Sequence, residues 1–185
     1  MTDLALQIRP EGPEDEEAIE RLHERAFGPG RFARTAFRLR ERGAATPELC
    51  FTASVGTLIV GSVRVSPILI GGAPALVLGP LAVEPAFEKR GIGAALTQRA
   101  LEAARAGGHR LVLLVGDEPY YSRFGFARAP AGRLEMPAPV NPARLLVAEL
   151  QPGALDGLEG RVMARRGLAP PAQAPGAAVR IETAS

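Results

Sequence analysis

The residues with the clearest chemical potential form a glycine-punctuated loop, Glu88-Lys-Arg-Gly-Ile-Gly-Ala94, between an apolar segment and a helical one. This order places several backbone N–H groups at the start of a helix, where they can bind a phosphate group. Gly91 and Gly93 have no side chain to block a ligand. Lys89 is the only lysine of the chain, and it lies beside Arg90 in this loop. The loop therefore predicts a phosphate-bearing ligand.

Two common phosphate-binding motifs do not fit this loop. A P-loop requires Gly-x-x-x-x-Gly-Lys followed by Ser or Thr, and a Rossmann dinucleotide site requires Gly-x-Gly-x-x-Gly. Neither pattern occurs around Gly91 and Gly93. Glycine turns before helices are common for packing reasons alone, so the loop needs support from the rest of the chain.

The segments on either side of the loop predict a mixed chain of strands and helices. Pro13 opens a helix with acidic residues in its first turn, which suits the positive end of the helix dipole. Ile19, Leu22 and Ala26 share the buried face of this helix, and His23 is expected on its polar side. We further expect strands at 4–9, 48–54, 57–70, 75–83, 111–115, 145–150 and 161–164, and helices at 31–42, 91–106 and 119–123.

One proline interrupts the predicted strand 75–83. Pro80 has no N–H to donate to a strand ladder, so it does not suit the middle of a regular sheet. With Gly79 beside it, the pattern predicts a β-bulge or a strand pushed away from its neighbour. Segment 111–115 is instead a continuous apolar run, typical of a strand covered on both faces.

Size and composition limit the class of protein. The chain has 185 residues, of which 46% are hydrophobic, and a formal net charge of +2. These values favour one domain, which we place at residues 1–168, followed by a loose tail rich in Pro, Ala and Gly at 169–185. The sequence has no stripe of basic residues with interleaved aromatics, the pattern that indicates nucleic-acid binding. No apolar stretch is long enough for a membrane span. A single cysteine, Cys50, and the lack of a signal-peptide pattern favour the cytoplasm.

The order of these motifs resembles that of the GNAT superfamily of acyl-CoA-dependent N-acetyltransferases. The resemblance rests on Leu81-Ala-Val-Glu-Pro85, Arg90-Gly-Ile-Gly-Ala94, Leu111-Val-Leu-Leu-Val115 and Tyr121-Ser-Arg-Phe-Gly-Phe126. The stretch from Gly116 to Phe126 is similar to a bacterial branch of predicted acetyltransferases. The resemblance implies an α/β (α+β) fold, in which helices flank a mixed, mostly antiparallel sheet with two splayed parallel strands. It also implies transfer of an acetyl group from acetyl-CoA to an amine, without a metal.

The resemblance further implies roles for individual residues. In the superfamily, coenzyme A lies in a wedge between the two splayed strands, here 75–83 and 111–115, and its pantetheine arm pairs with the first strand as an added strand would. The Leu81 N–H would stabilise the oxyanion, and Tyr121, from a Tyr-x-x-x-Gly-Phe pattern, would protonate the leaving thiolate. The implied cofactor-binding residues are Leu81, Ala82, Val83, Lys89, Arg90, Gly91, Ile92, Gly93, Ala94 and Tyr121.

Two positions depart from the superfamily pattern. The group that protonates the leaving thiolate also has an alternative. Glu88 stands where Gln or Arg is usual, and its carboxylate opposes a pyrophosphate unless it turns outward. Val77 stands where some relatives carry a glutamate base, and Glu84 is expected to face the turn. The pattern therefore names no general base, and bulk water or an already neutral amine would serve. Tyr120 is expected to pack or to shape the acceptor pocket; it or water is the alternative acid if Tyr121 is structural.

The acceptor stays open among a polyamine, an antibiotic, an amino acid and a protein N-terminus or lysine, that is, a small-molecule or peptide amine. By analogy of position we expect its site around Phe27–Phe32.

The alternative function is a non-catalytic acyl-CoA-binding sensor or regulatory module. His23, His109 and Cys50 do not make a metal cluster. Late strands often mediate dimers in this superfamily, so a homodimer is one expected assembly.

Overall fold

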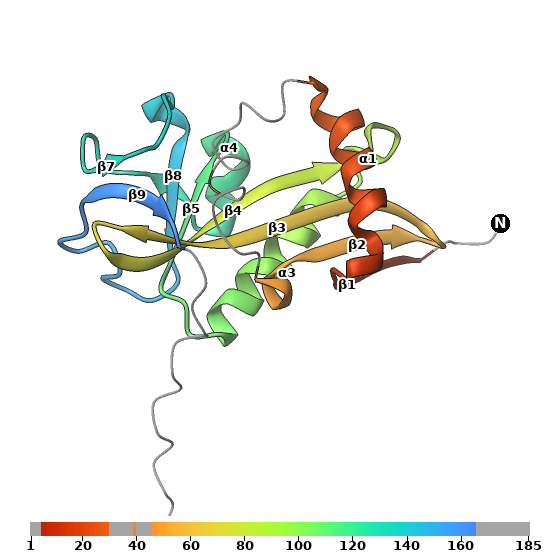
Figure 1. The fold of residues 1–185 in the computed structure, drawn as a ribbon, viewed down its shortest axis with the longest axis horizontal. Helices are drawn as coiled ribbons and strands as arrows, with labels where there is room; N and C mark the ends of the chain where they lie inside the picture. The colour runs from red at the N-terminus through yellow and green to blue at the C-terminus, as the bar shows by residue number, and fades with distance from the viewer. Residues whose placement is uncertain (1–4, 30–38, 40–45, 166–185) are drawn as a thin grey trace, which may run out of the picture.

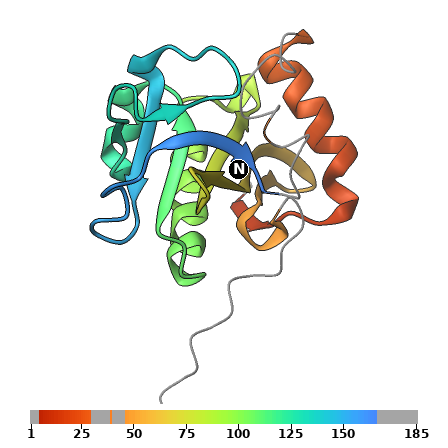
Figure 2. The same cartoon turned by 60° about the vertical axis from the view of Figure 1, so that its left-hand side comes forward.

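A mixed β-sheet runs through the molecule, with helix α1 (Glu16–Phe27) on one face and helix α3 (Ile92–Ala106) on the other (Figure 1). Figure 2 shows these two helices separated by the strands. The computed structural model describes residues 5–29, 39 and 46–165. The strands are β1 (Leu6–Pro10), β2 (Phe51–Val55), β3 (Leu58–Ile70), β4 (Ala73–Val83), β5 (Leu111–Val115), β6 (Ala127–Arg128), β7 (Leu134–Glu135), β8 (Leu145–Glu149) and β9 (Gly160–Ala164).

The sheet has the order β1-β2-β3-β4-β5-β8-β6, and β9 pairs with both β3 and β7. Strands β4 and β5 are parallel, as are β7 and β9, whereas the other pairs are antiparallel. The predicted mixed, mostly antiparallel sheet flanked by helices is therefore confirmed. Over the described residues, no helix is both long enough and apolar enough to cross a bilayer.

Strands β4 and β5 separate soon after they meet. They pair only at Leu76 with Val112 and at Val77 with Leu113. Farther along β4, the register with β3 steps from Leu78 opposite Val65 to Leu81 opposite Val63. Two residues of β4, Gly79 and Pro80, thus oppose one residue of β3, which is the predicted β-bulge. Beyond the bulge, β4 keeps β3 as its partner and leaves β5.

Side chains of β3 alternate between the two faces of the sheet, as strand geometry requires. Val63 and Val65 join the core under α3, together with Leu96. Arg64 points to the α1 face and is 1% exposed. Its guanidinium binds the Glu11 carboxylate, with Nε 2.8 Å from Oε2, and lies 3.5 Å from a Glu16 oxygen and 3.7 Å from a Glu20 oxygen. This buried cation ties the start of α1 to the sheet opposite the bulge. The predicted inward residues of α3, Ile92, Leu96 and Leu101, are buried.

Several predicted boundaries are shifted. The first strand is Leu6–Pro10, because it continues along β2 to the Pro10–Phe51 pair. Pro13–Asp15 is a 3-10 turn before α1, and Pro47–Leu49 is another before β2. Strands β6 and β7 were not predicted, since two residues are too few to show a period. The predicted helix 31–42, apart from the buried Leu39, and the tail 169–185 lie outside the described residues.

The prediction for His23 was wrong. This side chain is fully buried, and its ring lies 5.8 Å from that of Phe27. The physical reason is helical spacing: Ile19, Leu22 and His23 lie at i, i+3 and i+4, so His23 belongs to the same buried stripe.

Candidate active site at the splayed strands

The end of β4 presents an unpaired backbone edge. The Glu84 N–H donates to the Val60 carbonyl of β3 at 2.8 Å. In an antiparallel pair, every second residue directs both of its backbone groups to its partner, and the residues between direct theirs to the opposite edge. Ala82 therefore bonds toward β3, while Leu81 and Val83 direct their N–H and C=O groups to the side that β5 has left. Leu81 and Val83 are the residues whose backbone the family resemblance assigns to the cofactor.

Helix α3 begins at the same edge. Gly91 is its N-cap and has a φ of 81°, a left-handed conformation that favours glycine. The first helical bond runs from the Ala95 N–H to the Gly91 carbonyl at 2.9 Å. The amides of Ile92, Gly93 and Ala94 lie in the first turn, where a helix offers them no acceptor. Together with the helix dipole, they make a site suited to an anion.

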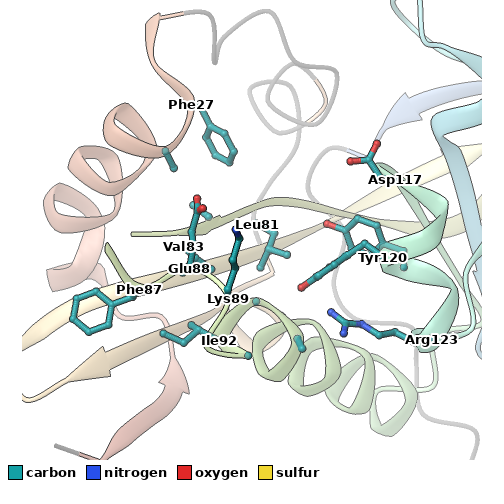
Figure 3. Close-up of a pocket in the computed structure, with 16 residues that line it drawn as sticks. Phe27, Leu81, Val83, Phe87, Glu88, Lys89, Ile92, Asp117, Tyr120 and Arg123 are labelled. Carbon is teal, nitrogen blue, oxygen red and sulfur yellow. The ribbon is translucent and has the colours of Figure 1, made fainter. Parts of the chain in front are cut away.

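The strand edge and the helix start open into one cavity of about 620 Å³, here called the β4–α3 cavity (Figure 3). Its lining is Ala26, Phe27, Leu81, Ala82, Val83, Phe87, Glu88, Lys89, Gly91, Ile92, Gly93, Ala94, Asp117, Tyr120, Tyr121 and Arg123. Of the predicted cofactor-binding residues, all but Arg90 belong to this lining. The Arg90 guanidinium instead lies 5.3 Å from the centre of the Phe87 ring. Glu88, the residue that departs from the superfamily pattern, also belongs to the lining.

Tyr121 is packed at the base of the cavity. Its ring lies so close to Gly116 that a methyl group at that position would overlap it. Edge-to-face contacts with Tyr120 and Phe126 hold the ring, at centroid distances of 4.8 and 5.8 Å. Burial raises the pKa of Tyr121 to about 12, and the Asp117 charge acts in the same direction. The phenol is therefore a neutral hydrogen-bond donor at physiological pH.

Tyr120 has a different environment. A methyl group on Gly93 would lie 2.9 Å from its hydroxyl oxygen, so this hydroxyl sits against the first turn of α3. The Arg123 guanidinium lies over the Tyr120 ring, 4.3 Å from its centre. Tyr120 thus lines the wall of the cavity formed with α3, next to the amides that could bind an anion.

Comparison with known proteins agrees with this geometry. Residues 46–128 match the model of the acetyltransferase (GNAT) domain. The chain is 32% identical over 159 residues to the uncharacterised N-acetyltransferase YhbS of Escherichia coli K12, covering 85% of this chain and 95% of that protein. The chain belongs to the GNAT acetyltransferase family.

Two solved GNAT structures are similar over most of their length. The structure of Escherichia coli YhbS in complex with CoA has a TM-score of 0.77 and 29% identity, and the match covers 89% of this chain and 92% of that one. A GNAT acetyltransferase from Brucella melitensis in complex with acetyl-CoA has a TM-score of 0.69 and 30% identity, over 88% and 97%. Both similarities extend well beyond the residues matched by the family model.

In this GNAT member, α1 forms the opposite wall of the cavity. Ala26 and Phe27 belong to the lining, whereas residues 30–32 of the predicted acceptor region lie outside the described residues. Glu84 does not face the turn as predicted, because its carboxylate pairs with the Arg25 Nε of α1 at 2.8 Å. This pair fastens the end of α1 to the end of β4.

The remaining candidates from the sequence are placed away from the cavity. Cys50 is buried, its sulfur contacts the Val65 backbone, and burial raises its thiol pKa to about 12, so it is not a nucleophile. His109 is half-buried beyond α3, and burial lowers its pKa. No group of three or more His, Cys, Asp or Glu in the described ranges is arranged to hold a metal ion.

Two lining residues, Asp117 and Arg123, were not singled out from the sequence. Asp117 is separated from β5 by Gly116 and directly precedes the short helix α4 (Glu118–Tyr121). The position of a polar residue at the end of a strand beside a ligand cleft is the signal that could have identified Asp117 from the sequence. It is weak here because Glu118 stands next to Asp117 and looks equivalent.

Proposed function

We propose that this GNAT family member transfers an acetyl group from acetyl-CoA to an amine of a small molecule or peptide. The observation that carries the proposal is the unpaired edge of β4 at Leu81 and Val83, which opens into the same cavity as the start of α3. A long ligand with an amide-containing arm and a pyrophosphate matches those two features in that order. YhbS and the Brucella protein, with which this chain shares the fold, were crystallised with CoA and acetyl-CoA.

Different groups of the chain would bind different parts of acetyl-CoA. The first-turn amides of α3, with Lys89 beside them, would hold the pyrophosphate, because both supply positive potential without needing a specific side chain. The backbone of Leu81 and Val83 would hold the pantetheine arm by strand addition. Glu88 lowers the positive potential of this end of the cavity, so its removal should tighten binding.

The reaction joins the amine nitrogen to the acetyl carbon and breaks the carbon–sulfur bond. The Leu81 N–H would donate to the oxygen that becomes negative during attack. Tyr121 would donate a hydrogen bond to the leaving sulfur. A phenol of pKa about 12 is a weaker acid than a thiol, whose ordinary pKa is about 8.5, so complete proton transfer from Tyr121 is unfavourable. The thiolate would instead take its proton from water, and the amine would lose its proton to bulk water.

Calorimetric titration with acetyl-CoA tests the binding half of the proposal, and dephospho-CoA is the control for the 3′-phosphate. We expect affinity in the micromolar range, about −8 kcal/mol. Thiol release with a panel of primary amines then tests transfer. Absence of any binding would refute the proposal.

A non-catalytic acyl-CoA sensor is the second candidate, favoured by Glu88 in the lining and by Val77 at the position where some relatives carry a glutamate base. A sensor would bind acetyl-CoA and release no thiol with any amine. The Glu88→Gln variant further distinguishes an acetyltransferase from a sensor. In an acetyltransferase, the substitution should lower the KM for acetyl-CoA and retain turnover.

A further inference from the structure

Asp117 brings a negative charge to the end of the β4–α3 cavity that lies away from the α3 loop. It is the N-cap of α4, and its side chain is 74% exposed. One carboxylate oxygen, Oδ1, lies 3.1 Å from the Nε of Arg144. Within the described part of the chain, the other oxygen has no hydrogen-bond partner. Figure 3 shows Asp117 on the α4 side of the cavity and Phe27 on the α1 side.

The charges around the cavity are separated by position. Lys89 and the first turn of α3 make one end positive. Arg123 is held against the rings of Tyr120 and Phe124, at 4.3 and 4.9 Å from their centres. At the other end, Asp117 is the only carboxylate in the described lining besides Glu88 of the loop. An anionic ligand part and a cationic one would therefore prefer opposite ends.

The neighbouring carboxylate behaves differently. Glu118 is part of α4 and does not line the cavity; its Oε2 accepts from the Nε of Arg128 at 2.6 Å. Asp117 also lies within electrostatic reach of the reacting centre, since its charge contributes to the raised pKa of Tyr121. Asp117 and the phenol that we place at the leaving sulfur line the same cavity.

We propose that Asp117 binds the ammonium group of the acceptor. This inference rests on the proposed function and names a recognition residue for its acceptor. Phe27 would cover the opposite side of the carbon chain, and Arg144 would orient the carboxylate without covering both oxygens. Attack still requires the amine to lose a proton, so Asp117 is a recognition residue rather than the base.

Binding of a matched pair of small probes tests the inference without turnover. Benzylamine is cationic at neutral pH, and benzyl alcohol is a neutral molecule of nearly the same shape. Each is titrated into the protein, with and without CoA, and binding is followed by NMR shifts of the backbone amides near Asp117 and Phe27. We expect benzylamine to bind about fivefold more tightly, the upper end of the range for an exposed ion pair.

Two variants separate ammonium binding from a merely structural ion pair. Asp117→Asn should bring the affinity ratio of the two probes to about one. Arg144→Gln also breaks the Asp117–Arg144 pair but keeps the carboxylate, so the ratio should persist or rise. Equal probe affinities in the wild-type protein, or equal effects of the two variants on the ratio, would overturn the inference.

Kinetic measurements distinguish failure of the proposed Asp117 recognition site from failure of the proposed function. If thiol release with amines is observed, Asp117→Asn should raise the KM for the amine about fivefold and leave the KM for acetyl-CoA unchanged. A wild-type protein that binds benzylamine selectively but releases no thiol would refute transfer and support the recognition site. Turnover in which arylamines match aliphatic amines would refute the recognition site and support transfer.

Discussion

The Tyr121 hydroxyl is the single group whose removal should affect chemistry more than binding. In Tyr121→Phe we expect kcat to fall about 100-fold, the lower end of the range for loss of one hydrogen-bond donor to a charge that develops in the transition state. The KM for acetyl-CoA should change little, because the ring and its contacts with Tyr120 and Phe126 remain. Steady-state thiol release measures both constants.

Tyr120→Phe is the matched control, since it removes the hydroxyl of the adjacent tyrosine. That hydroxyl sits against α3 at Gly93, so its loss should change acetyl-CoA binding more than kcat. A larger kcat effect from Tyr120→Phe than from Tyr121→Phe would transfer the assigned role to Tyr120.

The raised pKa of Tyr121 makes a prediction about stability at alkaline pH. A tyrosine ionises at about pH 10 when unfolded and here at about 12, so between these values the folded state binds more protons. The contribution of Tyr121 to stability is present in full below about pH 10 and is lost as pH rises toward 12. At about 1.4 kcal/mol per pKa unit, the loss is about 3 kcal/mol.

Two measurements test the raised pKa of Tyr121 and its effect on stability. The chain has two tyrosines and no tryptophan, so tyrosinate absorbance reports them without interference. Urea unfolding between pH 10 and 12 should show a shallower loss of stability in Tyr121→Phe than in the wild type. Cys50, whose pKa is also raised to about 12, contributes equally to both proteins, so identical slopes would contradict the assignment.

At the scale of elements, the parts predictable from sequence were those with local patterns. The loop before α3 carries its glycines in sequence, and the bulge is marked by Gly79 and Pro80 themselves. What could not be predicted depends on partners far along the chain. Glu84 is paired by Arg25, 59 positions away. Asp117 and Glu118 look alike in sequence, and only the fold shows that Asp117 lines the cavity and Glu118 does not. Asp117 pairs with Arg144, just before β8, and Glu118 pairs with Arg128 of β6.

The buried Arg64 is the element-scale contact with the largest expected energetic effect. Arg64→Met leaves Glu11, which is 15% exposed, with an unpaired charge between α1 and β3. Removal of one partner of a buried pair typically costs about 3–5 kcal/mol. Because Glu16 and Glu20 remain more exposed, we expect the low end, measured by urea unfolding.

The double variant Glu11→Leu with Arg64→Met is the control. Replacing both charges by apolar groups should restore most of the stability, since no buried charge is then left unpaired. If the double variant is no more stable than Arg64→Met, packing of the Arg64 side chain rather than its charge is what holds α1 on the sheet.

At the scale of the whole molecule, the sheet consists of two parts joined between β4 and β5 by two residue pairs. The proposed ligand would lie where further strand pairing is missing. Amide hydrogen exchange should therefore slow at Leu81 and Val83 when acetyl-CoA is added. Ala82, whose N–H already bonds toward β3, is an internal control and should be protected with or without ligand. Equal changes at all three amides would indicate general stiffening instead of strand addition.

The lysine content of the chain has a practical consequence. Lys89 is the only lysine, and it lines the cavity, so the only other primary amine of the polypeptide is its N-terminus. An amine-reactive dye at slightly alkaline pH would label the molecule at two places at most, one of them at the cavity. The rate of labelling at Lys89 would then report occupancy of the cavity by acetyl-CoA in the purified protein, without knowledge of the acceptor.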